Sequence, residues 1–170
     1  MSKVFDSIKD LQSQVAQWKA NGERVVFTNG VFDILHVGHV TYLEAAKNLG
    51  ERLIVGINDD ASVRSLSKGP ERPIHPEAAR AAVVAALRAV DATIIFSEPT
   101  PLELITAIRP DVLVKGGDYD PNETDASQKT YMVGSKEVKS YGGYVAAIPL
   151  VAGFSTTAAV NKMRNTHNKE

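Results

Sequence analysis

Two histidines, His36 and His39, lie three residues apart on either side of Gly38. An apolar run typical of a strand precedes them at 24–27, and apolar residues at helical spacing follow at 40–49. Backbone N–H groups at a helix start are unpaired and favour an anion. Because the spacing puts both rings on one face of the first helical turn, the pattern predicts a triphosphate site.

The other residues of this turn are further candidates for nucleotide binding. Gly38 lacks a Cβ and would let a phosphate approach the backbone closely. Asp33 is either a turn or capping carboxylate, or a residue that fixes the loop beside a bound cation. Zinc held by the two histidines and Asp33 is an alternative, although the spacing is not typical of a zinc site. The candidate nucleotide-binding residues in this turn are Thr28, Asn29, Gly30, Phe32, Asp33 and Gly38.

Basic residues between positions 68 and 80 form a second candidate group. They are either a solvated basic patch or the cations that neutralise a triphosphate and a second phosphorylated substrate. Candidate catalytic residues are His36, His39, Lys68 and Arg80. Candidate residues for binding the second substrate are Asp59, Arg72 and Lys136.

Two later segments complete the predicted site. Three hydroxyl residues open a final predicted helix; Ser155 suits an N-cap, and all three also suit a phosphate. The pair at 116–117 is either an ordinary tight turn or a place where a base or sugar approaches the backbone. The candidate nucleotide-binding residues in these segments are Lys115, Gly117, Asp118, Ser155, Thr156 and Thr157.

The elements that position these residues alternate between strands and helices. After the first strand, near-continuous apolar runs predict four more, at 52–57, 92–96, 111–114 and 144–148. This alternation predicts a doubly wound α/β domain, a five-stranded parallel sheet with helices on both faces. In such sheets ligands bind beyond the carboxyl ends of the strands, where the candidate clusters lie. We expect one domain over 1–170, with an N-terminal amphipathic helix within 1–22 and a disordered tail at 164–170.

Composition excludes several classes of protein. A chain of 170 residues with 44% hydrophobic content supports one core. The net charge of −1 provides no overall field for nucleic acid or an anionic membrane. The absence of cysteine excludes a thiolate metal site and a cysteine nucleophile. No stretch approaches the ~20 apolar residues of a membrane span, so we expect a cytoplasmic protein without a membrane or nucleic-acid partner.

The motif at 30–39, Gly-x-Phe-Asp-x-x-His-x-Gly-His, together with Ser-Thr-Thr at 155–157, resembles the cytidylyltransferase-like nucleotidyltransferases. Three further segments resemble the adenylyltransferase half of bifunctional ADP-heptose synthases. These segments are 68–73, 110–119 and 134–138, and the similarity covers about 24–163.

This resemblance implies a Rossmann-like fold and transfer of AMP from ATP to D-glycero-β-D-manno-heptose 1-phosphate, for the lipopolysaccharide inner core. His36 and His39 would then donate to the α-phosphate, residues 155–157 would hold the β- and γ-phosphates, and Lys68 and Arg80 would neutralise charge. The resemblance also implies Mg²⁺, bridged mainly through ATP phosphates, and a homodimer. Because 170 residues leave no room for a kinase half, we expect a separate heptose kinase and phosphatase to act earlier.

Two other functions fit the residues. One is a cytidylyltransferase or adenylyltransferase that uses another phosphorylated acceptor, such as glycerol 3-phosphate. The other is a regulatory module that binds ATP without turning it over.

Overall fold

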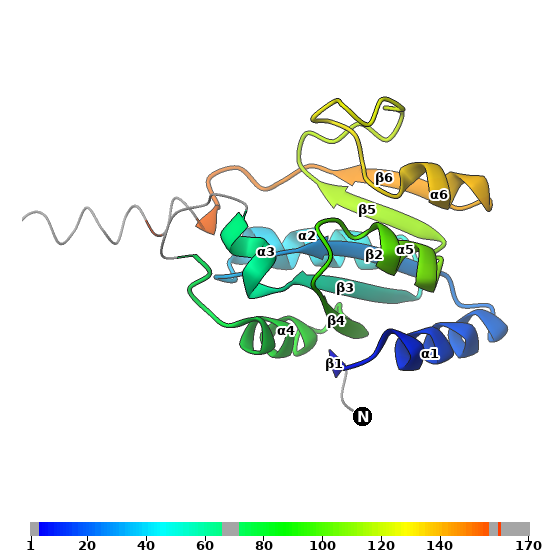
Figure 1. The fold of residues 1–170 in the computed structure, drawn as a ribbon, viewed down its shortest axis with the longest axis horizontal. Coiled ribbons are helices and arrows are strands. Elements are labelled where there is room, and N and C mark those ends of the chain that lie inside the picture. Colours follow the sequence, from blue (N-terminus) through cyan, green and yellow to red (C-terminus); the bar gives the residue numbers. More distant parts are fainter. Residues whose placement is uncertain (1–3, 66–71, 157–159, 161–170) are drawn as a thin grey trace, which may run out of the picture.

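A parallel β-sheet forms the centre of the molecule (Figure 1). The computed structural model describes residues 4–65, 72–156 and 160. In this part of the chain six strands pair in the order β1-β4-β3-β2-β5-β6, and every pair is parallel. The strands are β1 (Val4–Phe5), β2 (Val25–Gly30), β3 (Arg52–Asn58), β4 (Ala92–Phe96), β5 (Val112–Gly116) and β6 (Tyr144–Ile148).

The sixth strand corrects the prediction of five. Val4 and Phe5 pair with Thr93 and Ile94 at the open edge of β4, instead of belonging to the N-terminal helix. That helix, α1 (Ile8–Ala20), starts later because the Ser7 side chain accepts a hydrogen bond from the Asp10 backbone N–H at 3.1 Å and caps it. The extended residues before the cap are free to add a strand to the sheet.

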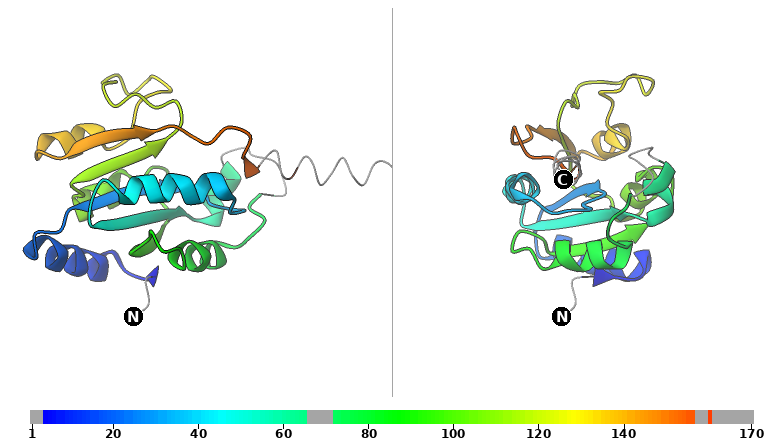
Figure 2. Two further views of the ribbon diagram at one scale, coloured as in Figure 1. Left: turned by 180° about the vertical axis from the view of Figure 1, so that it is seen from behind. Right: turned by 90° about the vertical axis from the view of Figure 1, so that its left-hand side faces the viewer.

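Helices cover both faces of the sheet, as predicted for a doubly wound fold. One face packs against α2 (Val37–Lys47) and α4 (Glu77–Ala85), and the other against α1, α5 (Leu102–Ile108) and α6 (Ser135–Ser140). Figure 2 shows the α2 face in its left view and the two layers edge-on in its right view. Each layer has its own buried apolar cluster. The short helix α3 (Asp60–Ser65) follows β3 directly.

The strand order reverses at β2, and this reversal locates the site. From β2 the chain adds β3 and then β4 on one side, and later returns to place β5 and β6 on the other. The connections therefore diverge at the carboxyl ends of β2 and β5 and leave a crevice between them. The segment that follows β6, orange in Figure 1, runs to the same end of the sheet.

The last predicted helix and the tail lie largely outside the described residues, which after position 156 include only Val160. Within the described ranges no helix has the length and apolar character needed to cross a membrane.

Candidate nucleotide-binding site

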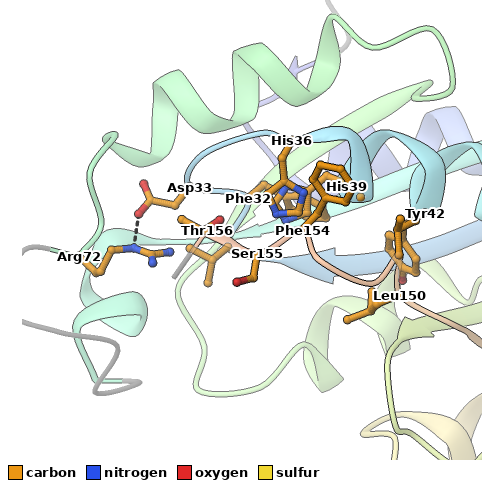
Figure 3. Close-up of a pocket in the computed structure, with 13 residues that line it drawn as sticks. Phe32, Asp33, His36, His39, Tyr42, Arg72, Leu150, Phe154, Ser155 and Thr156 are labelled. Atoms are coloured by element: carbon orange, nitrogen blue, oxygen red, sulfur yellow. Dashed lines mark hydrogen bonds and ion pairs between the residues drawn. The ribbon is translucent and has the colours of Figure 1, made fainter. Parts of the chain in front are cut away.

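The two motif histidines stack on each other at the start of α2 (Figure 3). Their ring centroids are 3.8 Å apart and the ring planes are 20° from parallel. His36 is the N-cap residue, with extended φ and ψ of −143° and 169°, and its carbonyl accepts a hydrogen bond from the His39 backbone N–H at 2.9 Å. The first helical turn thus sets the spacing of the rings.

The stacked rings carry buried nitrogen atoms whose hydrogen-bonding capacity is not satisfied. The Nδ1 atoms of His36 and His39 are buried and have no hydrogen-bond partner among the described residues. Burial, together with the neighbouring His36, lowers the pKa of His39 to about 4, against the opposing effect of a hydrogen bond with the Ile34 carbonyl. His39 is therefore uncharged at neutral pH in this structure, and an anionic ligand would favour its protonation.

Two glycines of the motif lie against aromatic rings with little room for a side chain. A Cβ on Gly38 would lie 3.0 Å from Nδ1 of His36, and a Cβ on Gly30 would lie 2.9 Å from the Phe32 ring. Phe32 has a positive φ of 49°, and its ring centroid lies 5.2 Å from that of His39. The turn between β2 and α2 thus holds the His39 ring beside Phe32, and the His36 ring stacks on that of His39.

A cavity of 510 Å³ opens beside the histidines. A volume of this size is within the usual range for small-molecule sites. It brings together eight of the predicted residues: Phe32, Asp33, His36, Gly38, His39, Arg72, Ser155 and Thr156. The lining residues that the sequence reasoning missed are Val31, Tyr42, Leu150, Val151 and Phe154.

Only one of the missed residues had a usable sequence signal. Tyr42 lies three residues after His39, on the same side of α2, so the helical spacing could have identified it. Leu150 and Phe154 belong to an irregular segment after β6 and are 61% and 50% exposed. They reach the cavity because the strand order brings that segment back to the start of α2, which local sequence does not reveal.

Asp33 connects the loop at 72–75 to the motif turn through hydrogen bonds. Its buried carboxylate accepts hydrogen bonds from Arg72 Nε and from the backbone N–H groups of Ile74 and His75, the latter two at 2.9 Å. Burial by itself would raise the pKa of Asp33, but these hydrogen bonds and the Arg72 charge outweigh it and lower the pKa. Asp33 therefore stays ionised and holds Arg72 at the edge of the cavity (Figure 3).

Arg80, in contrast, is almost fully buried and does not line this cavity. Its guanidinium donates to the carbonyls of His75, Val31 and Asn58 at 3.0, 2.6 and 2.7 Å, and to the Asp60 carboxylate at 2.7 Å. These bonds tie together the loops that follow β2 and β3. The geometry favours a structural role over the expected neutralisation of phosphate charge.

Three of the remaining candidates near β2 and β5 form side-chain hydrogen bonds. Thr28 Oγ1 and the Tyr42 hydroxyl are 2.6 Å apart and buried, which braces β2 against α2. Lys115 Nζ donates to Asn29 Oδ1, beside but outside the cavity lining. Gly117 continues from β5, and Asp118 is exposed. Asn29, Thr28, Lys115, Gly117 and Asp118 thus lie near the crevice without lining the cavity.

The other predicted residues lie on different elements of the fold, and two of them lie outside the described residues. Asp59 caps α3 by accepting the Ser62 backbone N–H at 2.7 Å. Lys136 is exposed on α6, on the sheet face opposite α2, and is absent from the cavity lining. Thr156 Oγ1 donates to the Ile34 carbonyl at 3.3 Å and so joins the C-terminal segment to the motif turn. Lys68 and Thr157 lie outside the described residues.

The side chains of the described residues do not form a metal cage. No group of three or more His, Cys, Asp or Glu is placed to hold a metal ion within the ranges 4–65 and 72–156. The Asp33 carboxylate is already occupied by Arg72 and two backbone N–H groups. Zinc held by Asp33 and the two histidines therefore has no support in the described geometry.

The fold and cavity together define a class of protein. A doubly wound parallel sheet, with paired histidines at a helix start and a cavity at the reversal of strand order, is typical of nucleotide-binding α/β proteins. Residues 27–162 match the family described as cytidylyltransferase-like, and the chain belongs to this family.

Curated relatives are similar over most of this chain. The bifunctional protein HldE of Methylobacillus flagellatus is 52% identical over 157 residues, which covers 92% of this chain and 30% of the relative. The bifunctional protein HldE of Koribacter versatilis is 55% identical over 153 residues, which covers 90% of this chain and 30% of the relative. The chain thus spans about a third of the length of these relatives.

Solved structures share the fold. A lipopolysaccharide core biosynthesis protein from Thermoplasma volcanium superposes with a TM-score of 0.58 at 29% identity, covering 76% of this chain and 98% of that one. A pantoate-beta-alanine ligase from Francisella tularensis has a TM-score of 0.61 at 15% identity, covering 100% of this chain and 80% of that one. At this low identity the likeness supports the fold alone.

Proposed function

We propose that this chain is an adenylyltransferase that transfers AMP from ATP to D-glycero-β-D-manno-heptose 1-phosphate, releasing pyrophosphate and forming ADP-heptose. The observation that carries the proposal is the stacked His36–His39 pair, with its unpartnered Nδ1 atoms, at the helix start beside the cavity. The heptose acceptor is supported by the identity to HldE proteins and by the likeness to a lipopolysaccharide core biosynthesis protein.

The reaction is an in-line displacement at phosphorus. An oxygen of the sugar phosphate forms a bond to the α-phosphorus of ATP while the bond from that phosphorus to the β-phosphate bridging oxygen breaks. Pyrophosphate takes the electron pair, and the enzyme needs no covalent intermediate. The protein contributes by orienting the two substrates and stabilising negative charge as it develops.

The cavity residues fit these tasks. His36 and His39 would contact the α-phosphate and the bridging oxygen, where charge builds in the transition state. Ser155 and Thr156, together with Thr157, would hold the outer phosphates at the start of the last predicted helix. Arg72, fixed by Asp33, would provide a positive charge at the edge of the cavity. Lys68 remains a predicted source of a second cation.

Magnesium would enter as part of the nucleotide substrate. Mg²⁺ in nucleotide sites is commonly held by substrate phosphates and water with few protein ligands. This mode of binding is consistent with a site whose described residues do not form a carboxylate cluster. The homodimer, the cytoplasmic location and the earlier action of a separate heptose kinase and phosphatase stay predictions.

Substrate profiling tests the proposal directly. The protein is incubated with Mg²⁺, ATP and either anomer of heptose 1-phosphate, and both pyrophosphate and ADP-heptose are measured. We expect product with the β anomer and ATP. Parallel reactions contain CTP with glycerol 3-phosphate, and ATP with no acceptor. Pyrophosphate release only with CTP and glycerol 3-phosphate, or no release with any pair, would refute the proposed activity.

A further inference from the structure

The side chains of Lys115 and Asn29 lie on the face of the sheet opposite to the face that packs against α2 and the histidines. Side chains alternate between the faces of a strand. Lys115 therefore shares a face with Leu113, and Asn29 with Phe27, and both apolar residues belong to the cluster under α1 and α5. Thr28, on the other face of β2, contacts Tyr42 of α2.

The two side chains lie next to each other across the crevice. Phe27 pairs in register with Leu113, so Asn29 and Lys115 come two residues later on adjacent strands. Lys115 Nζ donates to Asn29 Oδ1, and it lies 6.0 Å from the centroid of the Tyr119 ring. The ammonium group is thus held at the point where the strand order reverses.

Among the described residues Lys115 has no counter-ion, in contrast to Lys19 and Lys47. Lys19 pairs with Asp111 at 2.9 Å, and Lys47 pairs with Asp91. Among the described residues no carboxylate forms an ion pair with Lys115, and its partners are the neutral groups of Asn29 and Tyr119. Desolvation lowers the pKa of Lys115 to about 8. A partly desolvated cation without an anion is costly, and a bound anion would offset that cost.

The backbone after Lys115 is held tightly. A Cβ on Gly116 would lie 2.8 Å from Leu150 Cδ2 and 3.0 Å from the Tyr42 ring. Gly117 has a positive φ of 103°, and its N–H donates to the Ile148 carbonyl at 3.0 Å. Because these contacts come from α2 and from the end of β6, the position of Lys115 is fixed before any ligand binds.

In-line displacement requires the attacking oxygen and the leaving pyrophosphate to lie on opposite sides of the α-phosphorus. The cavity with the histidines, Arg72 and Thr156 lies on the α2 side and suits the triphosphate. The acceptor phosphate must then come from the other side of the crevice. We propose that Lys115, positioned by Asn29, binds the phosphate of the acceptor sugar 1-phosphate. This inference rests on the proposed function and assigns Lys115 to the acceptor instead of the nucleotide.

Calorimetric titration of two ligands tests the assignment without relying on turnover. The protein is saturated with Mg²⁺ and an ATP analogue that has a methylene group between the α- and β-phosphorus, and is then titrated with heptose 1-phosphate. Lys115→Met should weaken acceptor binding at least about tenfold, because a hydrogen bond to a charged group is lost. Binding of the ATP analogue should change less than about threefold.

Two more variants sharpen the comparison. Asn29→Ala should weaken acceptor binding by a smaller factor, since the ammonium remains but is less well placed. Lys129→Met removes an exposed positive charge from the loop between β5 and α6 and should change neither affinity. Equal loss of both ligands in Lys115→Met, or no loss of acceptor binding, would overturn the proposal.

Inorganic phosphate separates failure of this inference from failure of the proposed function. Titrated into the same analogue complex, phosphate should bind weakly to the unchanged protein and at least about tenfold more weakly to Lys115→Met. If phosphate binding depends on Lys115 while heptose 1-phosphate does not bind at all, the anion site stands and the heptose acceptor is wrong. If phosphate binding is independent of Lys115, the subsite is wrong whatever the acceptor.

Discussion

The imidazole rings of His36 and His39 are stacked 3.8 Å apart, one at the N-cap of α2 and the other in its first turn. Their Nδ1 atoms are buried without a partner among the described residues. In the proposed reaction, two polar rings held this closely by backbone geometry would not need to reorganise when a phosphate binds. This preorganisation is the property that makes charge stabilisation effective in catalysis.

Removal of one ring should therefore reduce turnover strongly. We expect His39→Ala to lower kcat at least ~100-fold, the usual cost of losing one preorganised donor. His75→Ala is the matched control, because its side chain is exposed outside the cavity lining. Steady-state kinetics and a thermal melt of each variant are the measurements. Near-normal kcat in His39→Ala, with the fold intact, would contradict the role of this histidine.

The low pKa of His39 predicts a stability that depends on pH. The pKa is about 4 in the folded state and 6.5 as a reference for the unfolded chain, so between these values the unfolded state binds more protons. Stability from this group is complete above about pH 6.5 and falls as the pH drops toward 4. Thermal melts of ligand-free protein from pH 7.5 to 4.5 should show a smaller loss in His39→Ala than in the unchanged protein. Parallel curves would show that His39 is not the titrating group.

Arg80 should matter for folding more than for phosphate binding. Arg80→Met leaves the Asp60 carboxylate and three backbone carbonyls without their donor. Asp60 keeps part of its side chain exposed, so the cost comes mainly from carbonyls left without a donor, and the free energy of unfolding should fall by about 2–3 kcal/mol. Arg88→Met is the control, since Arg88 is exposed and its pair with Glu44 contributes less than about 1 kcal/mol. Urea denaturation measures both, and equal effects would refute the structural role of Arg80.

Local sequence was sufficient for the motif turn and for the alternation of elements. Apolar runs, turn residues and helical spacing are short-range signals, and they predicted strands at 92–96 and 144–148 with the bounds the structure has. The spacing of His36 and His39 around Gly38 likewise predicted two rings on one helical turn. Such features depend on residues only a few positions apart.

Tertiary structure decided everything that depends on strand order. The edge strand β1 exists because the open edge of β4 is available to Val4 and Phe5, whose register partners Thr93 and Ile94 are each 89 residues away. The pairing of Lys115 with Asn29 depends on β5 returning to the side of β2, and the cavity contacts of Leu150 and Phe154 depend on β6 joining β5. The sequence by itself determined the alternation of an α/β chain and predicted a phosphate-binding turn within it. Only the packed sheet decided which distant side chains face it, because those contacts join segments that no local pattern relates.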